Sequence, residues 1–527
     1  MISITINSKK IQVNEGVSLL EAASVAGFEI PVMCNNGELE HFTSCMVCIV
    51  KDVSTGAYIP ACSAKAVDMM DIITEDDELS EARKTAIELL LSEHIGDCEA
   101  PCRVACPAFM DIPQMNRLIA QGKFAEALKV VKNDIAFPGV LGRICPAPCE
   151  GACKRKPIDQ AVSICLLKRF AFDEAEILPE KEAVLVTDKK VAIIGSGPAG
   201  LSAAYYLQLK GIQTSIFDSN EQAGGAMRYS ISDELLEKEV LDKEIQIIKG
   251  IGVTFFQHQL ITADAFKKLR NDFDAVVIAT GDFSESMANW GLENNGKQIL
   301  VNKINYLTNL EKVFAIGNAN RSMRLAIRSA AQGKEVATAI EQMFQGQPVN
   351  GELRRFNSTI GKLLPEEYSE YLKEASSLER QQPESVLMNG FSAEEARKEA
   401  SRCMHCDCRK PDQCLLRNLA ERYKASKKRF AFTARKPLKK VKEHSLIVYE
   451  PGKCIKCGIC VRLTGKYEEE FGFTFIGRGF DVEIGVPFNE KMNIALQKTA
   501  EKVAEACPTG ALAKLAEMPN GLNEKMI

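Results

Sequence analysis

The chain has 527 residues, of which 46% are hydrophobic and 26% are charged, as is typical of a soluble protein with several domains. The net charge of −4 does not indicate a nucleic-acid or membrane-surface partner, and no apolar run is long enough to span a bilayer. No signal-peptide pattern is found near the N-terminus, so we expect a cytoplasmic protein.

The 19 cysteines are the most informative feature of the composition. Disulfides are rare in a reducing compartment. The cysteines also fall into five closely spaced groups, as the ligands of metal or iron–sulfur sites do. Structural zinc is the alternative to an iron–sulfur cluster at each group.

Residues 1–80 are expected to form a small α+β domain. Alternating patterns predict strands at 2–6, 10–13, 47–51 and 58–60, and a helix at 18–26. Four cysteines spaced C-x10-C-x2-C-x13-C can present four thiolates to a [2Fe–2S] cluster. They are Cys34, Cys45, Cys48 and Cys62. The domain resembles the ferredoxin-like domain that begins the large iron–sulfur subunit of NADH dehydrogenases and iron-only hydrogenases.

A helical pattern over 81–180 contains the next two groups of cysteines. They are Cys98, Cys102 and Cys106, and then Cys145, Cys149 and Cys153. The stretch resembles the two-cluster domain of the small subunit of bacterial glutamate synthase, which dihydropyrimidine dehydrogenase and the large subunit of the ferredoxin-dependent transhydrogenase share. The resemblance implies two [4Fe–4S] clusters with interleaved ligands. One cluster would take Cys98, Cys102 and Cys153, and the other would take Cys106, Cys145 and Cys149.

Each of these clusters is one ligand short, because an upstream cysteine of the family is absent here. His94 is one candidate, since the hydrogenase-type domain places a histidine ligand four residues before a cysteine such as Cys98, and imidazole can replace a thiolate. Cys165 is the other candidate. If they are not ligands, His94 would be an ordinary surface histidine and Cys165 an ordinary buried free cysteine.

Residues 187–345 alternate between strands and helices and begin with a dinucleotide-binding fingerprint. Gly195 permits a tight turn, Gly197 lets the backbone approach a pyrophosphate, and Gly200 lets a helix pack close to the strand. Asp218 ends the second strand, where it can accept hydrogen bonds from a ribose. The sequence therefore predicts a Rossmann-like domain.

Three further segments of this domain, at 224–229, 275–281 and 313–318, resemble the flavin-binding loops and strands of the glutamate synthase family. In that family an acid on the last strand holds the ribityl chain of FAD, and Asn318 takes its place here. We therefore expect FAD. Its expected contacts are Gly195, Ser196, Gly197, Pro198, Ala199, Gly200, Asp218, Gly225, Met227, Arg228, Thr280, Gly281, Gly317 and Asn318.

The family inserts a second, NADPH-binding Rossmann domain before the last of these strands. Only 31 residues separate Gly281 from Val313 here, and they contain no second glycine fingerprint. A single βαβ unit takes about 30 residues or more. We therefore expect no NAD(P) site on this chain.

Residues 346–445 are polar and charged, and we expect a helical connector with a fourth group of cysteines. Cys403, Cys406, Cys408 and Cys414 form a compact C-x2-C-x-C-x5-C set that suits a [4Fe–4S] cluster, with zinc as the alternative. The basic run at 421–443 is most simply a solvated face. The alternative is a docking surface for an acidic partner such as ferredoxin.

Residues 446–527 are expected to form a small C-terminal module. Cys454, Cys457, Cys460 and the remote Cys507 resemble the cluster ligands of bacterial ferredoxin and imply one [4Fe–4S] cluster. The predicted fold class is thus multidomain α/β and α+β. It combines a ferredoxin-like [2Fe–2S] domain, a helical two-cluster domain, a Rossmann-like FAD domain and this module.

The expected function is that of an oxidoreductase subunit that relays electrons between one FAD, one [2Fe–2S] cluster and up to four [4Fe–4S] clusters, and that is active only within a complex. The expected partners are NADH-dehydrogenase-like FMN/iron–sulfur subunits and a catalytic redox subunit, such as a tungsten or molybdenum enzyme or a hydrogenase. Electron bifurcation at the FAD is implied only by analogy with the transhydrogenase. A glutamate-synthase-like NAD(P)H-dependent reductase subunit and a non-enzymatic scaffold with structural clusters are the alternatives. No catalytic residue is assigned.

Overall fold

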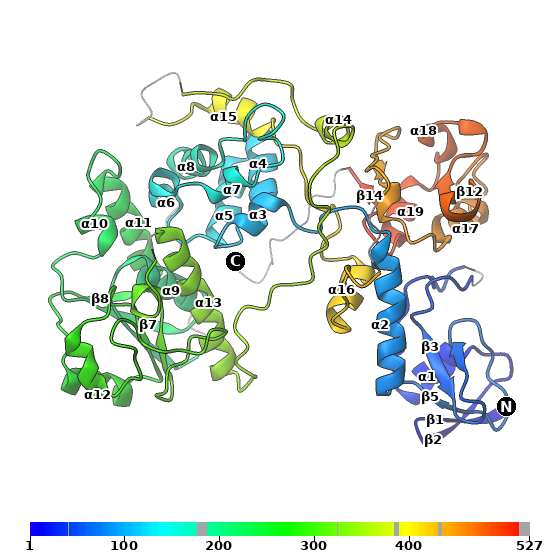
Figure 1. Ribbon diagram of the computed structural model, residues 1–527, viewed down its shortest axis with the longest axis horizontal. Coiled ribbons are helices and arrows are strands. Elements are labelled where there is room, and N and C mark those ends of the chain that lie inside the picture. Colours follow the sequence, from blue (N-terminus) through cyan, green and yellow to red (C-terminus); the bar gives the residue numbers. More distant parts are fainter. Residues whose placement is uncertain (40–41, 176–186, 324, 384–388, 431–434, 516–527) are drawn as a thin grey trace. The chain divides into compact units, whose positions relative to one another are not determined.

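A computed structural model of the chain describes all residues except 40–41, 176–186, 324, 384–388, 431–434 and 516–527 (Figure 1). The chain divides into two compact units, and each unit combines segments that are far apart in the sequence. The first contains residues 1–100, 355–373 and 406–521, and the second contains residues 101–354 and 374–405. The region 346–445, expected to be one connector, is therefore divided between the units.

The first unit begins with the small mixed domain that the sequence predicts. One sheet has the strand order β2-β1-β5-β3-β4. The bounds are β1 Ile2–Ile6, β2 Lys9–Val13, α1 Leu19–Ala26, β3 Ile49–Asp52, β4 Tyr58–Pro60 and β5 Asp71–Ile73. A capping box starts α1, because Ser18 and Glu21 each accept a hydrogen bond from the other's backbone N–H. The predicted hairpin and helix are confirmed, and β5 is an additional strand.

Helix α2 (Asp77–Ser92) crosses the domain boundary expected near residue 80. Asp76 caps its N-terminus by accepting a hydrogen bond from the backbone N–H of Leu79. Arg83 is fully buried on this helix and donates to the carbonyl oxygens of Ile49 and Thr74, each at 2.7 Å. These bonds attach α2 to the sheet, so the segment with His94 and Cys98 follows an anchored helix.

The remaining elements of the first unit are short. Strands β11 and β14 pair antiparallel, as do β12 and β13. The bounds are α14 Glu367–Leu372, α16 Leu415–Arg422, β11 Ile447–Tyr449, α17 Ile459–Lys466, β12 Thr474–Ile476, β13 Glu483–Gly485, α18 Met492–Ala495, α19 Ala500–Ala506 and β14 Leu512–Lys514. Helices α17 and α19 pack together, with Cys460 on α17 and Cys507 directly after α19.

The basic run at 421–443, expected to be a solvated face, is partly engaged inside the first unit. Arg429 pairs with the buried carboxylate of Glu88, with 2.9 Å between the charged atoms. Arg435 likewise pairs with the buried carboxylate of Glu367. Part of this run therefore holds the unit together.

The second unit begins with a group of short helices, as expected for 81–180. Their bounds are α3 Pro101–Ala105, α4 Ile112–Ala120, α5 Phe124–Lys132, α6 Pro138–Ile144, α7 Pro148–Gly151 and α8 Ile164–Glu174. Helix α15 (Ala393–Ala400) packs on α4 and α8, although it lies more than 200 residues later in the chain. The cysteine that follows α15 is thus brought to the helical group.

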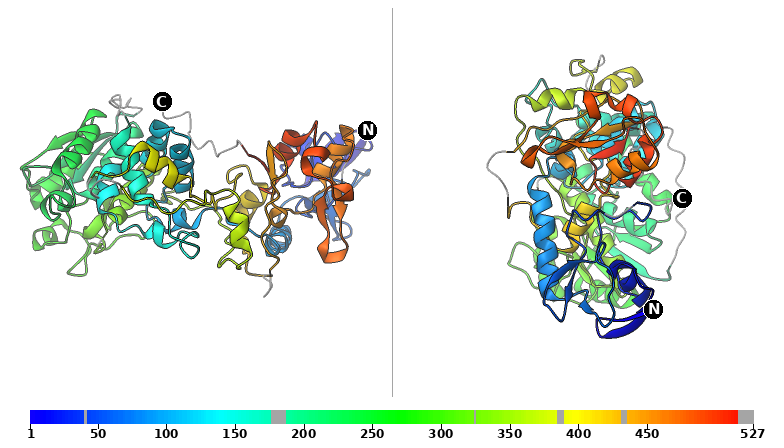
Figure 2. Two further views of the ribbon diagram at one scale, coloured as in Figure 1. Left: turned by 90° about the horizontal axis from the view of Figure 1, so that it is seen from above. Right: turned by 90° about the vertical axis from the view of Figure 1, so that its right-hand side faces the viewer.

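The second unit also contains a parallel five-stranded sheet in the order β10-β9-β6-β7-β8 (Figures 1 and 2). The bounds are β6 Lys190–Ile194, α9 Pro198–Leu209, β7 Gln213–Phe217, α10 Ala226–Tyr229, α11 Lys238–Gly250, β8 Thr254–Phe256, α12 Ala263–Asp272, β9 Ala275–Ile278, β10 Val313–Ala315 and α13 Ala326–Phe344. A Cβ on Gly333 would lie 2.5 Å from the carbonyl oxygen of Ala199, so glycine permits the close packing of α13 on α9. The Rossmann-like architecture is confirmed.

Between β9 and β10, the described residues form a short 3-10 helix, η1 (Glu285–Trp290), and contribute no further strand to the parallel sheet. None of the helices in the described part of the chain has the length and apolar character needed to cross a membrane.

Candidate functional site

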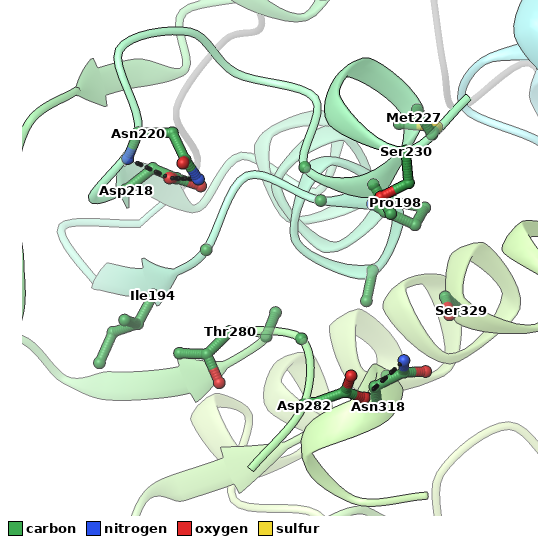
Figure 3. A pocket seen from close by; sticks show the side chains of 18 of the residues that line it. Ile194, Pro198, Asp218, Asn220, Met227, Ser230, Thr280, Asp282, Asn318 and Ser329 are labelled. Atoms are coloured by element: carbon green, nitrogen blue, oxygen red, sulfur yellow. Dashed lines mark hydrogen bonds between the residues drawn. The ribbon is translucent and has the colours of Figure 1, made fainter. Parts of the chain in front are cut away.

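The parallel sheet of the second unit carries a pocket of about 550 Å³ at the carboxyl ends of its strands (Figure 3). Ile194 ends β6 beside the pocket, and Thr280 and Gly317 follow β9 and β10 there. Ligands of open α/β sheets bind in such crevices. The pocket is thus the candidate site for a dinucleotide.

The turn between β6 and α9 has the geometry that its glycines predict. Gly195 has φ of +106°, and a Cβ there would lie 2.3 Å from the carbonyl oxygen of Ala279. A Cβ on Gly200 would lie 2.0 Å from the carbonyl oxygen of Gly195. Gly197 caps α9 and lines the pocket. The helix N-terminus can therefore face a phosphate without an intervening side chain.

Asp218 lies at the edge of the pocket and is held by its neighbours (Figure 3). One carboxylate oxygen accepts hydrogen bonds from the N–H and the hydroxyl of Ser196, each at 2.6 Å. The other accepts two hydrogen bonds from Asn220, each at 2.8 Å. The acid is thereby fixed in position beside the glycine turn.

Asn318 lies across the pocket and donates to the carboxylate of Asp282 at 2.9 Å (Figure 3). Its own side-chain oxygen accepts a hydrogen bond from the backbone N–H of Met323. Sequence reasoning missed Asp282, although it directly follows the Thr280-Gly281 turn. A carboxylate from a neighbouring loop therefore lies beside Asn318 in the pocket.

Cys145 lies next to this pocket, since Ile144 and Pro146 on either side of it line the pocket. Three further thiols lie near Cys145. The thiol of Cys165 hydrogen-bonds with those of Cys145 and Cys149. Cys106 interacts electrostatically with Cys145. The expected trio of Cys106, Cys145 and Cys149 is therefore brought together, and Cys165 joins it.

A buried lysine faces these four thiols. Lys168, one turn after Cys165 on α8, places Nζ 3.9 Å from its sulfur and is only 3% exposed. Burial by itself lowers the pKa of Lys168, but the four cysteines together raise it above its usual value. A positive charge is therefore held beside the thiols.

Helix α6, which ends just before Cys145, is fixed at its other end by a buried acid. The carboxylate of Glu244 on α11 accepts hydrogen bonds from the backbone N–H groups of Gly139 and Val140, at 2.8 and 2.9 Å. Burial raises the pKa of Glu244 to about 8. The acid satisfies two donors that the helix itself leaves unpaired.

A second group of cysteines in the same unit departs from the expected grouping. Cys403 is buried, hydrogen-bonds with Asn116 of α4 and interacts electrostatically with Cys153. Helix α3, which carries Cys102, packs on α7, which lies just before Cys153. The predicted set of four cysteines at 403–414 is thus divided, because α15 brings Cys403 to the helical group of the second unit.

In the first unit, the four cysteines of the predicted [2Fe–2S] site lie together. The sulfur atoms of Cys48 and Cys62 are 2.9 Å apart, and the thiol of Cys34 hydrogen-bonds with those of Cys45 and Cys62. All four side chains are buried.

The four cysteines of the C-terminal module also meet, around a small cavity that they line together. They are Cys454, Cys457, Cys460 and Cys507. Cys457 interacts electrostatically with Cys34 as well. The two predicted sites are therefore neighbours within the first unit.

Cys98 lies near Cys408 and Cys414, which the sequence analysis did not group with it. The backbone N–H of Cys408 donates to the carbonyl oxygen of Cys98 at 3.1 Å. The thiol of Cys414 interacts electrostatically with both.

Among the described residues, no three His, Cys, Asp or Glu side chains are gathered as they would be around a single metal ion.

Three domain families match the chain. They are a 2Fe-2S iron-sulfur cluster binding domain over residues 1–77, dihydropyrimidine dehydrogenase domain II with its 4Fe-4S cluster over 76–178, and pyridine nucleotide-disulphide oxidoreductase over 151–333. The chain contains these three redox domains. The matches imply iron–sulfur clusters and a flavin.

Curated relatives share parts of this arrangement. The chain is 32% identical to the NADPH-Fe(3+) oxidoreductase subunit beta of Geobacter sulfurreducens over 53% of its own length and 45% of the relative's. It is 34% identical to the NADP(+)-dependent formate dehydrogenase subunit beta of Moorella thermoacetica, over 44% of this chain and 38% of that one. It is 36% identical to the glutamate synthase [NADPH] small chain of Bacillus subtilis, over 35% and 40%. The chain thus spans less than half the length of these relatives.

Most of the residues expected to contact FAD line the pocket, but three do not. Those that line it are Gly195, Gly197, Pro198, Ala199, Asp218, Gly225, Met227, Thr280, Gly281, Gly317 and Asn318. Ser196 turns to Asp218, Gly200 packs against the turn, and Arg228 forms an ion pair with Asp242. These three residues therefore shape the pocket without lining it.

Proposed function

We propose that the chain is the electron-relay subunit of a larger oxidoreductase, with one FAD and iron–sulfur clusters placed beside it. The adjacency of the pocket and the Cys145 group carries this proposal, because Ile144 and Pro146 line the pocket and flank Cys145. FAD exchanges electron pairs, whereas a cluster exchanges single electrons, so this junction would convert one mode of transfer into the other.

FAD suits the residues of the pocket. The glycine turn and the N-terminus of α9 would hold the pyrophosphate, and Asp218 would hold the ribose. Asn318 and Asp282 would face the ribityl hydroxyls. The flavin would supply the hydride and electron chemistry, while these residues bind and orient it.

Eighteen of the 19 cysteines would belong to five cluster sites, and Cys406 is not assigned to any of them. The [2Fe–2S] ligands would be Cys34, Cys45, Cys48 and Cys62. The [4Fe–4S] ligands beside the pocket would be Cys106, Cys145, Cys149 and Cys165, and those of the C-terminal module would be Cys454, Cys457, Cys460 and Cys507. Cys102, Cys153 and Cys403 would belong to a further site, and Cys98, Cys408 and Cys414 to the last.

The complex would complete the reaction. We propose that no NAD(P) site lies on this chain, so nucleotide oxidation would occur on FMN/iron–sulfur subunits, and a catalytic redox subunit would meet the final substrate. The names of two relatives support the link to multi-subunit oxidoreductases, since both are beta subunits.

Cofactor analysis of the anaerobically purified full chain tests the relay. We expect one FAD and about 18 iron atoms per chain, with EPR signals from [2Fe–2S] and [4Fe–4S] centres after dithionite reduction. A Cys48→Ala variant should lose only the [2Fe–2S] signal. Zinc in place of iron, or a chain without flavin, would contradict the proposal.

Rapid mixing with NADH or NADPH tests the missing nucleotide site. We expect FAD absorbance to persist after mixing with either nucleotide, whereas dithionite bleaches it. Fast bleaching by NADH or NADPH alone would show a nucleotide site on this chain and favour a glutamate-synthase-like reductase.

A further inference from the structure

Two buried arginines of the second unit connect the segment after Cys153 to the segment before Cys403. Arg155 donates to the carbonyl oxygen of Arg402 at 2.6 Å, although the two residues are 247 positions apart in the chain. The carboxylate of Asp159 accepts hydrogen bonds from both guanidinium groups, at 2.8 Å from Arg155 and 3.0 Å from Arg402. Because Arg402 directly precedes Cys403, these bonds fix where that cysteine lies.

The site that Cys403 joins has too few thiols for a four-iron cluster. The second unit contains seven cysteines, and four of them form the group beside the pocket. The three that remain are Cys102, Cys153 and Cys403. A [4Fe–4S] cluster with a protein ligand on each iron needs one more group.

Asn116 lies at this site with half of its amide unused. Helix α15, which ends shortly before Cys403, packs on α4, which carries Asn116. The asparagine side chain is only 1% exposed and hydrogen-bonds with the thiol of Cys403. Its Oδ1 is also buried, and none of the described residues donates a hydrogen bond to it.

An unused oxygen on a buried amide is unfavourable, because the atom has lost its hydrogen bonds to water and has gained none from the protein. The oxygen has lone pairs that can bind a metal ion, and it belongs to a side chain that already contacts one of the three thiols. The side chain therefore fits a site that holds an iron atom beside Cys403.

We infer that the amide oxygen of Asn116 is the fourth ligand of a [4Fe–4S] cluster held by Cys102, Cys153 and Cys403. The inference rests on the proposed function, because it requires that the chain carry iron–sulfur clusters. An amide oxygen is neutral and is a harder ligand than a thiolate, so it binds the iron of a cluster more weakly. One negative charge fewer also makes the cluster easier to reduce.

Mild oxidation of the anaerobically purified full chain tests this ligand. Ferricyanide accepts one electron from a [4Fe–4S]²⁺ cluster, and release of one Fe²⁺ then leaves [3Fe–4S]⁺, which EPR detects. We expect the unaltered chain to give this signal, because the iron bound to Asn116 is held weakly. Released iron is measured in parallel.

Two substitutions of Asn116 should change this response in opposite directions. Asn116→Cys supplies a thiolate, so it should assemble as much iron as the unaltered chain, form about one [3Fe–4S] cluster per chain fewer, and have a more negative midpoint potential at this cluster. Asn116→Leu keeps the size of the side chain but cannot bind iron. It should show the three-iron signal before any oxidant is added.

Asn305→Leu is the matched control, because Asn305 is another buried asparagine of the second unit whose amide is fully used. Its nitrogen donates to the carbonyl oxygen of Val349 at 2.8 Å, and its oxygen accepts from the backbone N–H of Leu307 at 3.2 Å. This variant should respond to ferricyanide as the unaltered chain does.

Three results would overturn the inference. The first is an unaltered chain that forms no [3Fe–4S] cluster on oxidation. The second is an Asn116→Cys chain that lacks as much iron as the oxidised unaltered chain, either at assembly or after oxidation. The third is an Asn116→Leu chain that behaves like Asn305→Leu, which would mean that Asn116 only packs beside Cys403. An unaltered chain without iron would instead reject the proposed function.

Discussion

Replacing Cys165 with alanine should remove or damage the cluster beside the flavin pocket and leave the other cofactors in place. Cys165 hydrogen-bonds with two of the expected ligands and is the thiol that raises this group to four. With three thiolates left, the site should empty or retain a three-iron form, so the iron content should fall by about one to four atoms per chain. Iron analysis and EPR measure the change.

Leu166→Ala is the matched control, because it shortens the next side chain on α8 without removing a thiol. This variant should keep its iron, and both variants should keep FAD. A Cys165→Ala chain with its full iron content and an unchanged [4Fe–4S] signal would show that Cys165 is an ordinary buried cysteine.

Replacing Lys168 with methionine should lower the midpoint potential of the same cluster. Reduction adds a negative charge to the cluster, and the buried ammonium group near the four sulfur atoms stabilises that charge. Its loss should shift the potential by an amount on the order of 100 mV to the negative side, where about 59 mV corresponds to a tenfold change for one electron. An EPR-monitored redox titration measures this shift.

Lys168→Arg keeps the positive charge, so the midpoint potential of the cluster should stay close to that of the unaltered chain. Lys334→Met is a second control, because Lys334 is a partly buried lysine of the second unit that pairs with Asp134 rather than with thiols. If Lys168→Met and Lys334→Met lowered the midpoint potential of this cluster by the same amount, the effect of Lys168 would come from its part in folding and not from its charge.

Local sequence patterns were sufficient where the interacting residues are close along the chain. The Gly195 turn, the position of Asp218 and the four-cysteine set from Cys34 to Cys62 all agree with the structure. A turn of a few residues or a compact loop has little conformational choice, so spacing and glycine content predict its geometry. Strand alternation predicted the hairpin for the same reason.

Patterns failed where a ligand set depends on packing between distant segments. Spacing grouped Cys403 with Cys408, yet Cys403 contacts Asn116 and interacts with Cys153. The sequence did not predict the role of Asp282, because its hydrogen bond with Asn318 depends on how two loops pack at the same edge of the sheet.

The sequence by itself determined the class of cofactors, since thiol spacing and the glycine fingerprint depend on short-range chain geometry. It also named most of the residues that line the candidate dinucleotide pocket. Only the tertiary structure showed which thiols lie together, that Cys165 lies with Cys145 and Cys149, and that Lys168 faces them. Those contacts join helices and loops that the packing of their buried faces brings together. The spacing of residues along the chain does not predict that packing.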